Sequence, residues 1–155
     1  MLAKADIINT GYEVLFIALS GAFIAQVLKF LLHLIFKKEV DFKQFTTTGG
    51  MPSSHSAGVV GLSTAVGLIT GFDSILFSVA MGYAIIVMYD AAGLRRASGK
   101  MARCLNRIMD DFYKHDVQSA GGKLKELLGH TPVEVIAGAT LGILYAYYIH
   151  FWVLQ

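Results

Sequence analysis

Two short polar motifs, each directly ahead of a long apolar stretch, hold the residues of this chain that could do chemistry. The first is Gly-Gly-Met-Pro-Ser-Ser-His at 49–55, and the second is Gly-His-Thr-Pro-Val-Glu at 129–134. Each has a proline and a hydroxyl side chain where a helix would begin, so each would present backbone N–H groups and the positive end of a helix dipole. Such helix starts attract anions, and the glycines allow the backbone to curl around a phosphate.

The two histidines beside this expected phosphate site indicate one mechanism. His130 could attack phosphorus to form a phosphohistidine, and His55 could protonate the leaving oxygen, so no metal or other cofactor is required. Glu134 follows His130 by four residues, about one helical turn, and could hold the ring by accepting its other N–H. The same spacing fits a capping box with Thr131, in which Glu134 only closes the helix start. The sequence leaves both roles open.

Cationic side chains are expected to complete the phosphate site. Lys29 lies in the last third of the first apolar stretch, where a charge is costly unless it faces a polar cavity or reaches back to the membrane interface. Arg95 and Arg96 follow the third apolar stretch and could hold phosphate oxygens. Four other residues, Asp110, Asp111, His115 and Asp116, are not expected to bind a metal, because they lie among arginines without a repeated ligand spacing.

The composition indicates the class of protein that holds these residues in position. The chain has 155 residues, of which 55% are hydrophobic and 15% charged, with one cysteine. This excludes a disordered chain and a disulfide scaffold, and it leaves too little polar surface for a water-exposed globule. We therefore expect one membrane-embedded domain over 1–155, with no nucleic-acid partner.

Long uncharged stretches predict about four transmembrane helices. They cover approximately 12–36, 56–71, 74–92 and 132–154, and the short connection at 71–73 makes the second and third an antiparallel hairpin. Small residues recur every four positions in two of them, which indicates close helix packing: Ala57, Gly61 and Ala65, then Gly138, Gly142 and Ala146. The predicted fold class is an all-α helical bundle, and homo-oligomerisation through these ridges is left open.

The basic residues predict the orientation. Of 13 Lys and Arg, 11 lie in the connections after the first and third spans, and four spans place both connections on one side. Because such an excess marks the cytoplasm, the two polar motifs should face inward and both termini outward. The expected location is a bacterial plasma membrane.

The connection after the third span contains a predicted amphipathic helix at 94–112. Its apolar residues recur at three-and-four spacing, with basic residues on the other side. The helix either lies along the cytoplasmic leaflet or packs against the bundle as a solvated helix. A second short helix is expected within 116–129.

Three motifs resemble those of the divergent branch of the type 2 phosphatidic acid phosphatases, which are related to the vanadium haloperoxidases. Pro-Ser-Ser-His at 52–55 is similar to the superfamily's Pro-Ser-Gly-His motif. The stretch 129–138 is similar to its final motif, in which a histidine is followed four positions later by an aspartate and then by Ala-Gly. The stretch Tyr-Asp-Ala-Ala-Gly-Leu-Arg-Arg at 89–96 resembles one typical of the divergent branch.

The resemblance implies a role for each matching residue. His130 would be the nucleophile, Glu134 its orienting carboxylate and His55 the general acid, while Ser53 and the adjacent backbone at Ser54 would bind phosphate. The chain departs from the pattern at Ser54, where the superfamily has glycine, and at Glu134, where it has aspartate. It also lacks the serine-arginine pair that precedes the nucleophile.

The expected function is metal-independent hydrolysis of a lipid phosphomonoester or pyrophosphate, with the lipid phosphate as substrate and the bilayer as surroundings. Lipid is inferred from location, because a headgroup at the interface can enter a pocket between helix ends while its chain stays in the bilayer. Two rivals remain open: a non-catalytic phospholipid-binding or transport protein that keeps the anion pocket, and a purely structural membrane subunit.

Overall fold

The structure, a computed structural model, describes residues 7–37, 49–113, 124 and 129–154, without the side chains of 37, 94–96 and 111–113. All regular structure in this part is helical, which confirms the all-α class. The helices are α1 (Gly11–Lys37), α2 (Ser54–Thr70), α3 (Ile75–Ala92), α4 (Leu94–Tyr113), α5 (Pro132–Tyr148) and a terminal π-helix, η3 (Ile149–Leu154). The short helix expected within 116–129 falls almost wholly outside the described residues.

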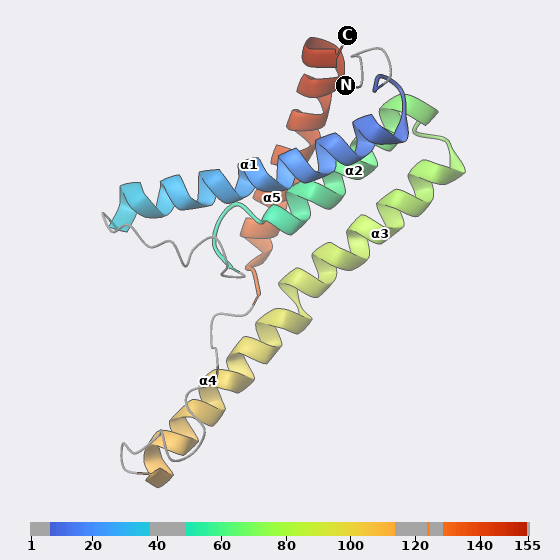
Figure 1. The fold of residues 1–155 in the computed structure, drawn as a ribbon. Helices are drawn as coiled ribbons and strands as arrows, with labels where there is room; N and C mark the ends of the chain where they lie inside the picture. The colour runs from blue at the N-terminus through green and yellow to red at the C-terminus, as the bar shows by residue number, and fades with distance from the viewer. Residues whose placement is uncertain (1–6, 38–48, 114–123, 125–128, 155) are drawn as a thin grey trace.

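Helix α2 is the centre of the bundle. It packs against α1, α3 and α5, and α1 crosses α5 beside it (Figure 1). The contact between α2 and α5 is close because small residues line it: a Cβ on Gly138 would collide with the carbonyl oxygen of Ser53, and one on Gly142 with that of Ala57. The small-residue ridges predicted from the sequence therefore serve helix packing within this chain.

The expected hairpin between the second and third apolar stretches is present. Gly71 ends α2 with φ 93°, a conformation that favours glycine. Ser74 caps α3 by accepting the backbone N–H of Phe77 at 3.1 Å. Farther along the hairpin, the Ser63 hydroxyl donates to the carbonyl of Ala80 at 2.9 Å, so a buried polar group also ties α2 to α3.

The number of membrane-length helices differs from the expectation of about four. Three stretches in the described part are long and apolar enough to cross a membrane: Gly11–Phe36, Ile75–Asp110, which contains α3, and Pro132–Leu154. The remaining predicted span, 56–71, corresponds to α2, which has 17 residues. Since α2 is enclosed by three neighbours, it can bury hydroxyl side chains such as Ser56 and Thr64 and needs a less apolar surface than a lipid-facing helix.

Candidate active site

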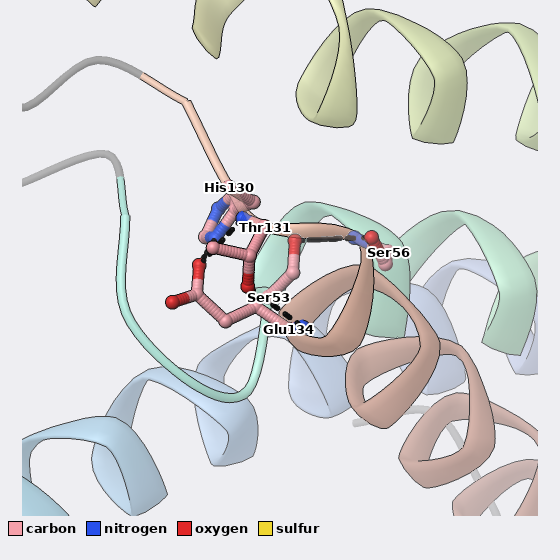
Figure 2. A network of polar contacts seen from close by, with 5 residues as sticks. All are labelled: Ser53, Ser56, His130, Thr131 and Glu134. Atoms are coloured by element: carbon pink, nitrogen blue, oxygen red, sulfur yellow. Dashed lines mark hydrogen bonds and ion pairs between the residues drawn. The ribbon is translucent and has the colours of Figure 1, made fainter.

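The two polar motifs meet at one end of the bundle. The backbone N–H of Ser53, just ahead of α2, donates to the carbonyl of Glu134 in the first turn of α5 at 3.0 Å. The N–H of His130 donates to the carbonyl of Ala91 near the end of α3 at 2.9 Å. The starts of α2 and α5 and the end of α3 therefore converge (Figure 2), as the sequence predicted for the two motifs.

Helix α5 begins here because neighbouring residues in the sequence cap its first turn. The Thr131 hydroxyl accepts the N–H of Glu134 at 3.4 Å, and Oε2 of Glu134 accepts the N–H of Thr131 at 3.1 Å. Pro132 follows the cap, where its fixed φ suits a first helical turn and its missing N–H has no cost. This is the capping box that the sequence offered as one role for Glu134.

The same carboxylate also holds the histidine. Oε2 of Glu134 lies 3.1 Å from Nδ1 of His130 (Figure 2). Glu134 therefore both closes the start of α5 and contacts the imidazole ring. Because an ionised carboxylate can only accept, the contact places the ring proton on Nδ1 and leaves the lone pair of a neutral imidazole on Nε2. His130 is 4% exposed and Glu134 21%, so the pair is largely shielded from water and the ring is held in one orientation.

The start of α2 is built around a buried serine. Ser53 is the N-cap, and its hydroxyl oxygen accepts from the N–H of Ser56 at 3.3 Å and from the Ser56 hydroxyl at 3.0 Å. The preceding Pro52 therefore stands before the cap rather than in the first turn, and it follows a cis peptide bond. Ser54 opens the helix half-buried, and His55 is exposed in the same turn, which is the positive end of the helix dipole.

Lys29 of α1 also reaches this end of the bundle. Its side chain is buried, at 5% exposure, and a Cβ added to Gly50 would lie 3.0 Å from its Cδ. The negative charge of the Glu134 carboxylate attracts the Lys29 ammonium. The lysine thus lies inward against the first polar motif, which explains how a charge is tolerated within a membrane-length helix.

Glycines allow the two motifs to approach each other. Gly49, Gly50 and Gly129 have φ values of 142°, 89° and 94°, which other residues rarely adopt. A Cβ on Gly49 would lie 3.3 Å from the carbonyl oxygen of Gly129. The backbone on both sides of the site is therefore drawn together where a side chain would separate it.

Not every predicted site residue is placed by this geometry. Arg95 and Arg96 belong to the first turn of α4, close in sequence to Ala91, but their side chains lie outside the described part, as do the side chain of Asp111 and all of His115. Phosphate contacts from the two arginines stay a prediction, as do the roles of His55 and Ser54.

A second buried carboxylate–imidazole pair was not predicted from the sequence. At the opposite end of the bundle, Oε1 of Glu13 lies 2.6 Å from Nδ1 of His150, and Oε2 of Glu13 accepts the N–H of Asn9 at 2.7 Å. Glu13 is 0% exposed and His150 is 5% exposed. A usable signal did exist, since ionisable residues inside apolar spans are costly and rarely lack a partner.

These features define a class: a helical membrane protein in which a histidine, oriented by a carboxylate, stands at the start of a membrane-length helix. Residues 10–145 match the Divergent PAP2 family, and the chain belongs to this family. It is 44% identical over 137 residues to the uncharacterized membrane protein YuiD of Bacillus subtilis (strain 168), with 82% of this chain and 87% of YuiD covered. No solved structure matches. The resemblance drawn from the motifs is thereby confirmed at the level of the family.

Proposed function

We propose that this single-domain protein hydrolyses a phosphomonoester or pyrophosphate bond of a lipid through a covalent phosphohistidine at His130. The observation that carries the proposal is the 3.1 Å contact between Nδ1 of His130 and Oε2 of Glu134. It orients the ring with the nucleophilic lone pair on Nε2, as an attack on phosphorus requires. The first motif, at the start of α2, and the buried Lys29 beside it supply a setting that favours a phosphate anion.

The reaction has two steps. In the first, Nε2 of His130 bonds to phosphorus while the bond from phosphorus to the leaving oxygen breaks, and protonated His55 donates its proton to that oxygen. In the second, neutral His55 accepts a proton from water as the water oxygen attacks phosphorus, which releases inorganic phosphate and restores His130. Glu134 acts as a positioning residue, because it fixes the ring and stabilises the positive charge that the ring gains on phosphorylation.

Cationic groups would stabilise the transferred phosphoryl group. The Lys29 ammonium lies on the same side of the bundle as the Glu134 carboxylate and is shielded from water, so its attraction for phosphate oxygens would be strong. Arg95 and Arg96 would add bidentate donors from the first turn of α4. These contacts replace the arginine that the wider superfamily carries shortly before its nucleophile.

The location of the site supports a lipid substrate. The site is at the ends of three helices, two of which belong to stretches of membrane length, so a headgroup at the bilayer surface could reach it while its chain stays among the helices or in lipid. The excess of Lys and Arg in the sequences that follow α1 and α3 supports a site at the cytoplasmic face of a plasma membrane.

A non-catalytic lipid-phosphate binder is the second candidate. One observation favours it: the sequence lacks the serine-arginine pair that precedes the nucleophile in the wider superfamily. A protein of this kind would hold the phosphate through Lys29 and the helix starts without turnover.

Phosphate release from a panel of lipid phosphates by the purified protein separates the two candidates. We expect release by the unaltered chain, its abolition in His130→Ala, and retention in Val133→Ala, a control in the same turn of α5 whose side chain is 66% exposed. An acid-labile, alkali-stable phosphoprotein should be trapped only when His130 is present. Saturable binding without release, or release that survives His130→Ala, contradicts the enzymatic proposal.

Vanadate offers an independent test of the same chemistry. Because it adopts the five-coordinate geometry of phosphoryl transfer, it should inhibit release competitively. Indifference to vanadate counts against a phosphohistidine route.

A further inference from the structure

Helix α4 carries an apolar face that the described part of the chain leaves open. Met101, Leu105 and Ile108 are 58%, 48% and 47% exposed, and their three-and-four spacing aligns them along one side of the helix. Among the helices, α4 packs chiefly against α3, with which it runs nearly end to end away from the bundle (Figure 1). This arrangement disfavours the expectation that α4 packs as a solvated helix on the bundle.

The chain that returns from α4 toward α5 is anchored on a different face. The side-chain amide of Asn106 donates to the carbonyl of Leu124 at 2.9 Å and accepts its N–H at 2.8 Å. Asn106 and Ala102, which lie on the same side of α4, are 3% and 7% exposed. Leu124, the one residue between 114 and 128 that the structure describes, therefore lies against a small and polar face, and the side chains of Met101, Leu105 and Ile108 stay exposed.

A third side of α4 is basic. Lys100, Arg103 and Arg107 are exposed, and at 100° per residue they lie on the far side of the helix axis from Leu105. Lys100 and Arg107 are each about 100° from the nearest residue of the apolar stripe, so their long side chains can extend toward the plane that the stripe faces, whereas Arg103 lies on the opposite side. An apolar stripe combined with such cations is the pattern of a helix that binds an anionic membrane surface.

Helix α4 directly follows a helix of membrane length. Only Gly93 separates its first residue from the last residue of α3, which lies in a stretch of membrane length. Packing against a second copy of the chain would cover the apolar stripe but leave the cations facing outward, whereas anionic headgroups satisfy both the apolar stripe and the cations. We propose that α4 docks Met101, Leu105 and Ile108 into the headgroup region of an anionic leaflet, turning at Gly93 to do so.

The test uses the full chain in proteoliposomes and a fluorophore on single cysteines. In a Cys104→Ser background, Leu105→Cys reports on the stripe and Arg103→Cys on the opposite side. With phosphatidylglycerol present, the label at 105 should be quenched by spin-labelled lipid and the label at 103 by aqueous iodide, with accessibilities differing about threefold or more, as for a helix lying in the interface. In phosphatidylcholine alone, the difference should shrink.

Charge variants test whether the basic side chains of α4 cause the dependence on phosphatidylglycerol. With the label at 105, Lys100→Gln combined with Arg107→Gln should abolish the dependence on phosphatidylglycerol, whereas Lys100→Arg with Arg107→Lys should preserve it. Equal iodide access at both labelled positions overturns the proposal, because α4 then projects into water. Shielding of position 105 from both quenchers, with Leu105→Cys cross-linking between copies, also overturns it, because a second copy then covers the stripe. Neither measurement depends on phosphate release.

Discussion

Oε2 of Glu134 contacts Nδ1 of His130 and the backbone N–H of Thr131, each at 3.1 Å. One oxygen atom therefore starts α5 and orients the imidazole that precedes it. The ring cannot turn without disturbing the helix start, and the helix start fixes where the ring points. Such shared use of a carboxylate keeps a candidate nucleophile rigid within a membrane-embedded bundle.

Substituting Glu134 with glutamine separates these two roles. The amide oxygen of Glu134→Gln can still accept the N–H of Thr131, so the helix start should survive with a loss of no more than about 1 kcal/mol. Phosphate release should fall roughly 10²–10⁴-fold, because the negative charge that stabilises the charged ring is lost. Release assays and thermal unfolding in the same detergent check both expectations. Unchanged turnover in Glu134→Gln would show that the contact serves capping alone.

The helix starts of this protein were predictable because they are set by residues close in sequence. Thr131 and Glu134 form the predicted capping box around Pro132, and a hydroxyl side chain of the first motif, that of Ser53, caps α2. The meeting of the two motifs was also predictable, since the parity of apolar stretches puts them on the same side of a membrane.

Other features depend on contacts between residues that are far apart in the sequence, which a local sequence pattern cannot predict. Glu13 and His150 are 137 positions apart, so the cost of an ionisable residue in an apolar span predicts that each has a partner but not which residue it is. The burial of Lys29 against Gly50 likewise depends on how α1 lies beside the first motif. The position of Lys29 in an apolar stretch indicates that its charge is costly in a membrane. It does not show whether the ammonium faces a polar cavity or reaches the membrane interface.

Lys29→Met should distinguish a phosphate-binding lysine from a structural one. If the ammonium holds phosphate, KM for the lipid phosphate and the inhibition constant for vanadate should each rise about tenfold or more, because a shielded charge contact is lost. Unfolding should be little affected or shifted to higher temperature, since the methionine has no charge to bury. The control is Lys29→Arg, which keeps the charge and should keep part of the affinity. Wild-type KM in Lys29→Met contradicts a role in binding.

Gly138→Ala tests whether the close approach of α2 and α5 supports the site. A methyl group there would collide with the carbonyl oxygen of Ser53, so the helices must separate where Ser53 and Glu134 are hydrogen-bonded, at a cost of about 1–3 kcal/mol. Gly82→Ala is the matched control, because a Cβ at Gly82 meets nothing within 4 Å and alanine favours the helix. Thermal unfolding of the two variants gives the comparison, and equal midpoints would refute the packing argument.

The Glu13–His150 pair should hold the far end of the bundle closed without taking part in the chemistry. The pair joins the first turn of α1 to η3 beside the buried side chains of Ile17, Ile149 and Leu154. Glu13→Ala would leave His150 and the N–H of Asn9 without their buried acceptor, which should cost about 2–4 kcal/mol and lower the unfolding midpoint. Because Lys29, His130 and Glu134 lie at the other end, phosphate release per folded molecule should stay within about twofold of the unaltered protein below that midpoint. Glu13→Gln retains an acceptor and should recover part of the loss. A fall in release without a fall in stability would instead show that this second pair takes part in the reaction or is coupled to it.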